Sequence, residues 1–129
     1  MNIPQDLLYT DSHEWIRAEG SAGTIGITDY AQQALSDITF VELPVVGKTF
    51  AKGDEIAAIE SCKAAAGLNA PVGGKVTAVN TALEDDPGLV NSDPYGSGWI
   101  VKIAIADPGE LAALLKPADY APLAEQEES

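Results

Sequence analysis

Residues 52–75 read KGDEIAAIESCKAAAGLNAPVGGK, and they hold two short apolar segments on either side of Lys63. Gly53 and Gly74 mark turns outside these segments. Short apolar segments bounded by turn residues are typical of antiparallel strands. Lys63 stands ten residues after Gly53 and eleven before Gly74. The spacing therefore predicts a hairpin with Lys63 at its exposed tip, although no Asn-Gly or Asp-Gly step marks a tight turn there.

The same pattern extends over most of the chain, where short apolar alternations are separated by Gly, Pro, Asn and Asp. The expected strands are residues 24–28, 38–43, 55–60, 64–69, 75–79 and 99–105. In the last strand the apolar residues alternate with others, as in a strand with one buried face. The pattern predicts a mainly β protein built as small antiparallel sheets or a barrel-like sandwich.

Two short helices have recognisable start signals. Asp29 is expected to cap a helix that runs to Ser36. Asp107 is expected to cap a second helix, with Glu110 completing a capping box and an apolar stripe of leucines behind it. Pro117 is expected to end this second helix.

The length and the charge limit the possible functions. The chain has 129 residues, which fits a single domain over 1–129, and residues 121–129 are expected to form a flexible acidic tail. Twenty acidic residues against seven basic ones give a net charge of −13. Binding to nucleic acid or to an anionic membrane depends on Lys and Arg, so neither partner is expected.

The cysteine count and the N-terminus indicate the compartment. Cys62 is the single cysteine, which excludes an internal disulfide, and no Cys/His cluster for a metal is present. The N-terminal residues lack the basic and apolar regions of a signal peptide, and no apolar run is long enough to span a membrane. The sequence indicates a bacterial cytoplasmic protein, expected to be monomeric when alone.

The sequence contains few candidate catalytic groups. His13 is the only histidine, and neither a nucleophile elbow nor a phosphate loop nor a dinucleotide-binding glycine pattern occurs. An autonomous enzyme is therefore not expected. Lys63 is the remaining candidate, because an amine at a hairpin tip can carry a covalent prosthetic group. A lysine amine with an ordinary pKa of about 10.4 is mostly protonated at neutral pH, so a separate enzyme must attach that group.

Several motifs occur in order between Tyr9 and Tyr120. They are SHEW at 12–15, GITDYAQ at 26–32, VELP at 41–44, ESCKAA at 60–65, PVGGKV at 71–76, LVN at 89–91 and DPYGSGW at 93–99. Together they resemble the H-protein family of the glycine cleavage system. The resemblance covers nearly the whole chain, which makes it far more specific than any single motif.

The resemblance implies a fold, a cofactor and a set of partners. The fold is a lipoyl/biotinyl-type flattened barrel-sandwich of two small antiparallel sheets, with short peripheral helices including one near the C-terminus. The cofactor is lipoate, covalently attached to Lys63. The implied function is to accept the aminomethyl group of glycine from the pyridoxal-phosphate (PLP)-dependent glycine decarboxylase and to carry it to the tetrahydrofolate-dependent aminomethyltransferase. Dihydrolipoyl dehydrogenase, which uses FAD, then reoxidises the carrier.

The resemblance also implies roles for four further residues. Glu60 and Gly74 match positions that the lipoate-attaching enzymes read, although Glu60 could equally form a cross-strand charge pair and Gly74 could be a turn residue with positive φ. Ser12 and Glu14 match positions that line the cleft for the loaded arm. From the residues alone, the segment around them is equally compatible with a structural cluster.

Two positions depart from the family pattern. Gly67 stands where an acidic residue near the arm cleft is common, so a less polar or more mobile cleft is expected. Cys62 replaces the usual valine and is expected to be a small buried apolar side chain. A biotin carrier is disfavoured, because residues 62–64 lack the Met-Lys-Met signature. The alternative function is an H-like lipoyl protein that donates lipoate to other complexes.

Overall fold

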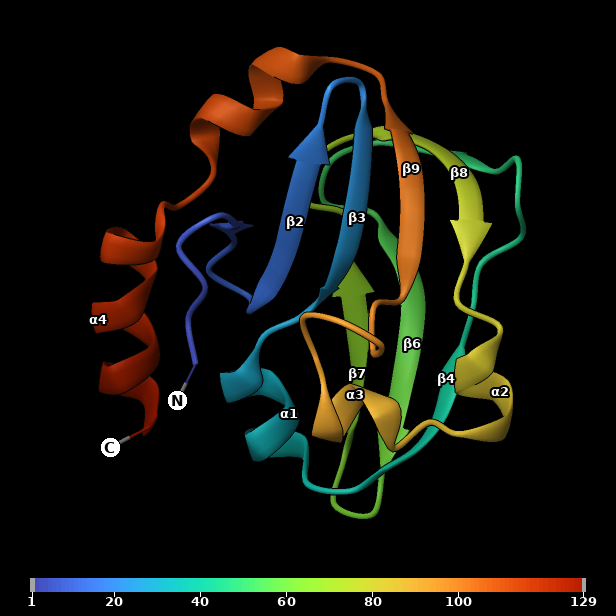
Figure 1. The fold of residues 1–129 in the computed structure, drawn as a ribbon, viewed down its shortest axis with the longest axis vertical. Helices are drawn as coiled ribbons and strands as arrows, with labels where there is room; N and C mark the ends of the chain where they lie inside the picture. Colours follow the sequence, from blue (N-terminus) through green and yellow to red (C-terminus); the bar gives the residue numbers. More distant parts are fainter. Residues whose placement is uncertain (1, 129) are drawn as a thin grey trace.

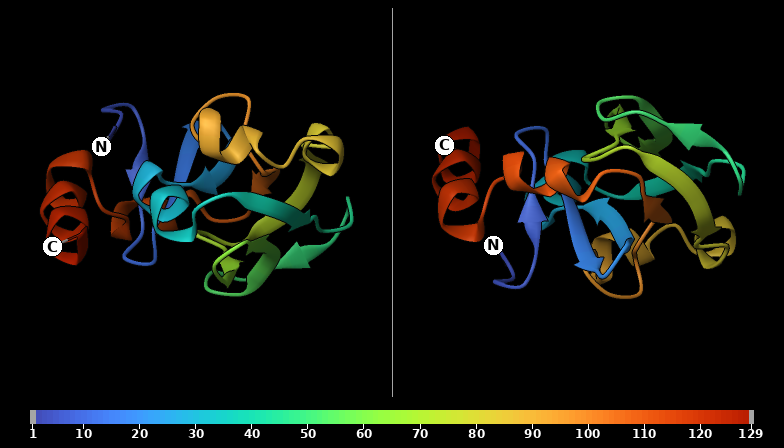
Figure 2. Two further views of the ribbon diagram at one scale, coloured as in Figure 1. Left: turned by 90° about the horizontal axis from the view of Figure 1, so that it is seen from below. Right: turned by 90° about the horizontal axis from the view of Figure 1, so that it is seen from above.

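The computed structural model describes residues 2–128, which form two antiparallel sheets packed face to face (Figures 1 and 2). The strands are β1 (Leu8–Tyr9), β2 (Glu14–Glu19), β3 (Ala22–Ile27), β4 (Ile38–Glu42), β5 (Thr49–Phe50), β6 (Glu55–Ser61), β7 (Ala65–Asn69), β8 (Gly74–Val79) and β9 (Val101–Ile105). One sheet has the order β1-β2-β3-β9-β8-β5, and the other has the order β4-β6-β7. The mainly β sandwich is confirmed, but the sheets are unequal in size and do not close into a barrel within the described residues.

Short helices lie around the sandwich, as expected. They are α1 (Asp29–Leu35), α2 (Ala82–Asp85), α3 (Leu89–Ser92), the 3-10 helix η1 (Pro108–Ala113) and α4 (Pro117–Glu128). The expected cap of α1 is wrong by one residue, because the hydroxyl of Thr28 accepts the hydrogen bond from the Ala31 N–H. Within residues 2–128, no helix is long and apolar enough to cross a bilayer.

The expected helix after Asp107 is a 3-10 helix and has no capping box. The Asp107 carboxylate accepts from the Gly109 N–H at 2.9 Å, so the cap itself is confirmed. Glu110, however, accepts from the Gly73 N–H at 2.8 Å, which ties η1 to the loop before β8. Pro117 begins α4 rather than ending a helix, because the first helical position needs no N–H donor.

The expected flexible tail is helical as far as the structure describes it. Helix α4 continues to Glu128, and Ser129 lies outside the described residues. Tyr120 and Ala124 are fully buried, and the Tyr120 ring stacks on Tyr9 at 4.6 Å between centroids. The Tyr120 hydroxyl also hydrogen-bonds His13 at 2.7 Å. Contacts with distant residues therefore stabilise a helix that its own weakly amphipathic sequence does not signal.

The main core lies between the two sheets and sets the register of the hairpin that carries Lys63. Ile59 on β6 and Leu68 on β7 are almost fully buried in it, as are Val101 and Ile103 on β9. Each such side chain stabilises the fold by about 1.5–3 kcal/mol. A slip of one residue would turn Ile59 and Leu68 toward solvent, so their burial fixes the register.

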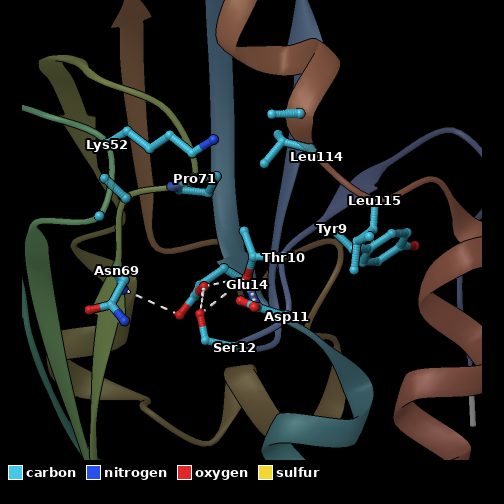
Figure 3. A pocket seen from close by; sticks show the side chains of 13 residues that line it. Tyr9, Thr10, Asp11, Ser12, Glu14, Lys52, Asn69, Pro71, Leu114 and Leu115 are labelled. Atoms are coloured by element: carbon cyan, nitrogen blue, oxygen red, sulfur yellow. Dashed lines mark hydrogen bonds between the residues drawn. The ribbon is translucent and has the colours of Figure 1, made fainter.

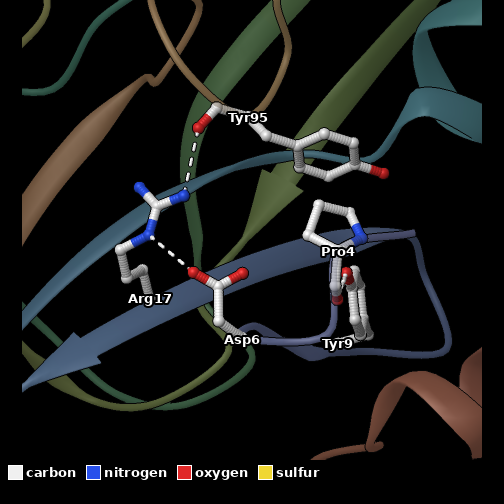
Figure 4. Close-up of polar contacts among 5 residues, drawn as sticks. All are labelled: Pro4, Asp6, Tyr9, Arg17 and Tyr95. Atoms are coloured by element: carbon white, nitrogen blue, oxygen red, sulfur yellow. Dashed lines mark hydrogen bonds and ion pairs between the residues drawn. The ribbon is translucent and has the colours of Figure 1, made fainter. Parts of the chain in front are cut away.

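The N-terminal segment is fastened to the larger sheet by polar contacts (Figure 4). The Tyr9 hydroxyl donates to the Pro4 carbonyl at 2.6 Å, and burial raises the pKa of Tyr9, so the hydroxyl keeps its proton. Arg17 donates to the Tyr95 carbonyl at 3.3 Å and lies 3.9 Å from Asp6. These contacts hold the segment that leads into the start of β2.

Candidate functional site

Lys63 is exposed at the tip of the β6–β7 hairpin, as the sequence predicts (Figure 1). Glu60 and Ala65 are the last paired residues of β6 and β7, so the residues between them, which include Lys63, form the turn. Among the described residues, no side chain forms an ion pair or hydrogen bond with the Lys63 ammonium group. The amine is therefore accessible to another protein and fits covalent attachment.

The hydroxyl of Ser61 holds the turn that presents Lys63. It accepts hydrogen bonds from the Lys63 N–H at 3.3 Å and from the Ala64 N–H at 3.0 Å, and it donates to the Ala64 carbonyl at 2.8 Å. The Cys62 N–H donates to the Asp37 carbonyl at 3.1 Å, which ties the turn to the segment before β4. This role of Ser61 was not predicted from the sequence, although serine is a common turn residue because its hydroxyl hydrogen-bonds nearby backbone groups.

Substituting Ser61→Ala is expected to loosen the turn without unfolding the sheet. The variant loses three local hydrogen bonds, which together should lower the free energy of unfolding by about 1 kcal/mol. Amide hydrogen exchange at Lys63 and Ala64 should accelerate, while exchange at Leu68 should not change. Ser61→Thr keeps the hydroxyl and is the matched control. Unchanged exchange at both turn amides in Ser61→Ala would contradict this role of the hydroxyl.

Cys62 and Glu60 lie beside Lys63. Cys62 is exposed, so the expectation of a buried apolar side chain is wrong, because the turn directs it away from the core. Glu60 is also exposed, on β6. The structure thus brings Glu60 and Lys63 together at one end of the hairpin.

Gly74 lies far from Lys63 and is constrained by packing rather than by a turn. It is the first residue of β8, which starts at the opposite end of the molecule from the β6–β7 turn (Figure 1). It is not among the glycines with positive φ, so the turn interpretation is wrong. A Cβ at Gly74 would lie 2.3 Å from the Ala104 carbonyl oxygen on β9. The neighbouring strand therefore excludes any side chain here.

A cavity of about 410 Å³ lies between the loop before β2, the end of β7 and the segment after η1 (Figure 3). Ser12 and Glu14 both line it, together with Asn69 from β7. Glu14 is the first residue of β2, a strand that is not among those expected from the sequence. Apolar groups from Tyr9, Pro71, Leu114 and Leu115 complete much of the wall, and Lys52 also lines it.

Glu14 is a buried carboxylate held by three donors. Only 2% of its surface is exposed. Its Oε1 accepts from the hydroxyls of Thr10 and Ser12, the latter at 2.6 Å, and its Oε2 accepts from the Asn69 N–H at 3.3 Å. Thr10 and Asn69 were not predicted from the sequence, because only the fold brings them to Glu14.

The cavity suits a small group that carries positive charge. Burial raises the pKa of Glu14 above its ordinary value, and the hydrogen bonds from Ser12, Thr10 and Asn69 offset part of that rise. A buried carboxylate is destabilised when ionised, and an ammonium group beside it would relieve that cost. The apolar wall formed by Leu114 and Leu115 would accommodate a hydrocarbon chain attached to such a group.

The raised pKa of Glu14 predicts a pH-dependent loss of stability. The folded protein holds this proton more tightly than the unfolded chain, so the stabilisation is complete below the unfolded pKa and is lost as pH rises through the folded pKa. Glu14→Gln removes this dependence. The variant also loses one acceptor for the Asn69 N–H, which lowers its stability by the same amount at every pH. Thermal unfolding between about pH 4 and pH 8 should show the stability of the parent falling relative to the variant. If the stability of the parent and that of Glu14→Gln changed in parallel with pH, the raised pKa of Glu14 would be contradicted.

Gly67 is not among the residues that line the cavity, and its expected effect on the polarity and mobility of this cleft stays a prediction. A Cβ at Gly67 would lie 2.0 Å from the carboxylate oxygen of Glu55. The side chain of Glu55, from the neighbouring strand, therefore covers the position. An acidic group lies over residue 67 even though that residue has no side chain.

Comparison with known proteins shows the family to which this chain belongs. The family described as "Glycine cleavage H-protein" matches residues 7–127. The glycine cleavage system H protein of Listeria innocua is 54% identical over 120 residues, which cover 93% of this chain and 96% of the relative. That of Carboxydothermus hydrogenoformans is 51% identical over 125 residues, covering 97% and 96%.

A solved structure shows the same fold. The crystal structure of a glycine cleavage system H protein from Mycobacterium marinum superposes with a TM-score of 0.83 at 39% identity, covering 98% of this chain and 100% of that one. The two-sheet fold of this chain is therefore that of a glycine cleavage H protein. The chain belongs to the glycine cleavage H-protein family and is a lipoyl carrier component of the glycine cleavage system.

Proposed function

We propose that lipoate is attached in amide linkage to the ε-amino group of Lys63. The observation that carries this proposal is the exposed Lys63 amine, unpaired within the described part of the chain, on a turn held by Ser61. An amine in this position can enter the active site of an attaching enzyme while the sandwich remains folded. Glu60 beside the turn is the residue that such an enzyme would read directly. Gly74 acts by keeping β8 and β9 in close contact.

The lipoyl group supplies a disulfide that can be reduced as it takes up a substrate fragment. The chain's own residues present and shelter that group. Ser61 fixes the direction of the turn, and Lys63 supplies a flexible stem. Ser12 and Glu14 line the cavity that receives the loaded end, where the carboxylate holds a bound amine in its cationic form and thereby opposes loss of nitrogen.

In this function the chain acts as a carrier and performs no catalytic step of its own. It receives the aminomethyl group of glycine while bound to the PLP-dependent decarboxylase and delivers it while bound to the tetrahydrofolate-dependent aminomethyltransferase. The FAD enzyme dihydrolipoyl dehydrogenase then restores the oxidised carrier. Tethering makes each transfer effectively intramolecular within a docked pair.

Reconstitution tests this function. The lipoylated chain should support exchange of labelled bicarbonate into glycine by glycine decarboxylase, and the unlipoylated chain should not. The alternative function, donation of lipoate to other complexes, is tested with the same preparation and an unlipoylated acceptor domain from another complex. Exchange without donation supports the proposal. Donation without exchange would assign the chain to lipoate relay instead.

A further inference from the structure

The outer face of the β4-β6-β7 sheet is exposed and carries an unusual set of side chains. Phe40 on β4 is 51% exposed, which is uncommon for so large an aromatic side chain. Cross-strand pairing puts Phe40 opposite Glu60, and Glu42 opposite Ala58. Paired residues of antiparallel strands point to the same side of a sheet. Phe40, Glu42 and Glu60 therefore share the outer face, while Val41 points into the core.

This face leads directly to Lys63. Glu60 is three residues before the lysine, and Ile38, at the start of β4, pairs with Ser61 in the turn segment. In Figure 2 the three-stranded sheet lies at the outside of the molecule, with the larger sheet on its inner side. Ala58 and Gly67, which pair across β6 and β7, are small, and the Glu55 side chain lies over Gly67 and adds a carboxylate to this face.

The charge of the face favours a basic partner. Glu42, Glu55 and Glu60 are exposed, and strands β4, β6 and β7 contain neither lysine nor arginine. The chain as a whole has a net charge of −13. Complementary charge increases the rate of association, and a large aromatic side chain that becomes buried often contributes much of the binding energy of an interface.

We propose that this face, with Phe40 as its large exposed apolar side chain, is the docking surface for the enzyme that attaches the lipoyl group. An enzyme that acts on the ε-amino group must approach the base of the lysine stem, so it must contact the strands beside the turn. Enzymes that act on the far end of the loaded stem react at a greater distance from these strands. We therefore expect this enzyme to have an apolar recess that receives Phe40, bordered by basic side chains that face Glu42 and Glu60. This inference rests on the proposed attachment at Lys63.

The test measures attachment kinetics on the purified unlipoylated chain, with lipoate, ATP and a lipoate-protein ligase. Phe40→Ala should lower kcat/KM about tenfold, mainly through KM, because one large aromatic contact is lost. Phe40→Leu should recover part of the loss. Val46→Ala is the matched control: Val46 is 55% exposed but lies beyond the end of β4 that is far from the turn. Thermal unfolding of each variant checks that the fold is retained.

The charge is tested separately with Glu42→Lys, which should raise KM and weaken its dependence on salt. Equal kcat/KM for Phe40→Ala and Val46→Ala would overturn the docking surface and leave the attachment proposal intact. If Phe40→Ala instead impairs glycine decarboxylase exchange by the pre-lipoylated chain and leaves attachment unchanged, the face belongs to the decarboxylase. Dimerisation of the parent chain that Phe40→Ala abolishes would assign it to a second copy. Failure of the parent chain to accept lipoate at Lys63 would refute the proposed function itself.

Discussion

Substituting Lys63→Arg is expected to reduce decarboxylase exchange to the level measured without the chain. Arginine keeps the positive charge and the length of the side chain, but its guanidinium group stays protonated and cannot form the amide. Lys63 is exposed and unpaired among the described residues, so thermal unfolding should match that of the parent. The reconstituted exchange assay measures the effect.

Lys75→Arg is the matched control for this variant. Lys75 is an exposed residue of β8, so its substitution should leave exchange at the level of the parent. Substantial exchange by the Lys63→Arg variant would show that the carrier function does not depend on this lysine. Equal losses in both variants would indicate a general effect of arginine on folding or on docking.

Gly74→Ala is expected to destabilise the fold by about 1–3 kcal/mol, because the added Cβ would be forced against backbone. It would lie 2.3 Å from the Ala104 oxygen, and β8 and β9 would have to separate locally. For a chain of this size the midpoint of thermal unfolding should fall by roughly 4–12 °C.

Gly67→Ala is the matched control for this glycine. Its added Cβ also meets a close neighbour, but that neighbour is the mobile end of the Glu55 side chain. The change in stability should therefore stay within about 0.5 kcal/mol. A loss for Gly74→Ala no larger than that for Gly67→Ala would contradict the packing account of Gly74. Attachment at Lys63 in Gly74→Ala should be assayed well below its unfolding midpoint, so that recognition is separated from folding.

The features that follow from local patterns were predictable from the sequence. The two apolar segments around Lys63 placed the hairpin and its tip correctly, although only Gly53 of the two flanking glycines lies in a turn. The alternation on β9 was also found, because Val101 and Ile103 face the core while Lys102 is exposed. Asp107 was recognised as a cap, because capping is a local interaction.

Features that depend on contacts between distant residues were not predictable in this way. Helix α4 is stabilised by the stacking of Tyr120 on Tyr9, more than a hundred residues away in sequence. Glu110 turns from its expected capping role to the Gly73 N–H, which only the folded chain brings near. The burial of Glu14 likewise depends on Asn69 and on the segment around Leu114.

Attachment of one lipoyl group to Lys63 in the cell can be measured by intact mass spectrometry of the full chain purified from its native host, followed by peptide mapping. We expect a mass increase of a single lipoyl group, located on the peptide that contains Lys63. An unmodified Lys63 in cells with competent lipoylation, or a lipoyl group mapped to another lysine, would contradict it.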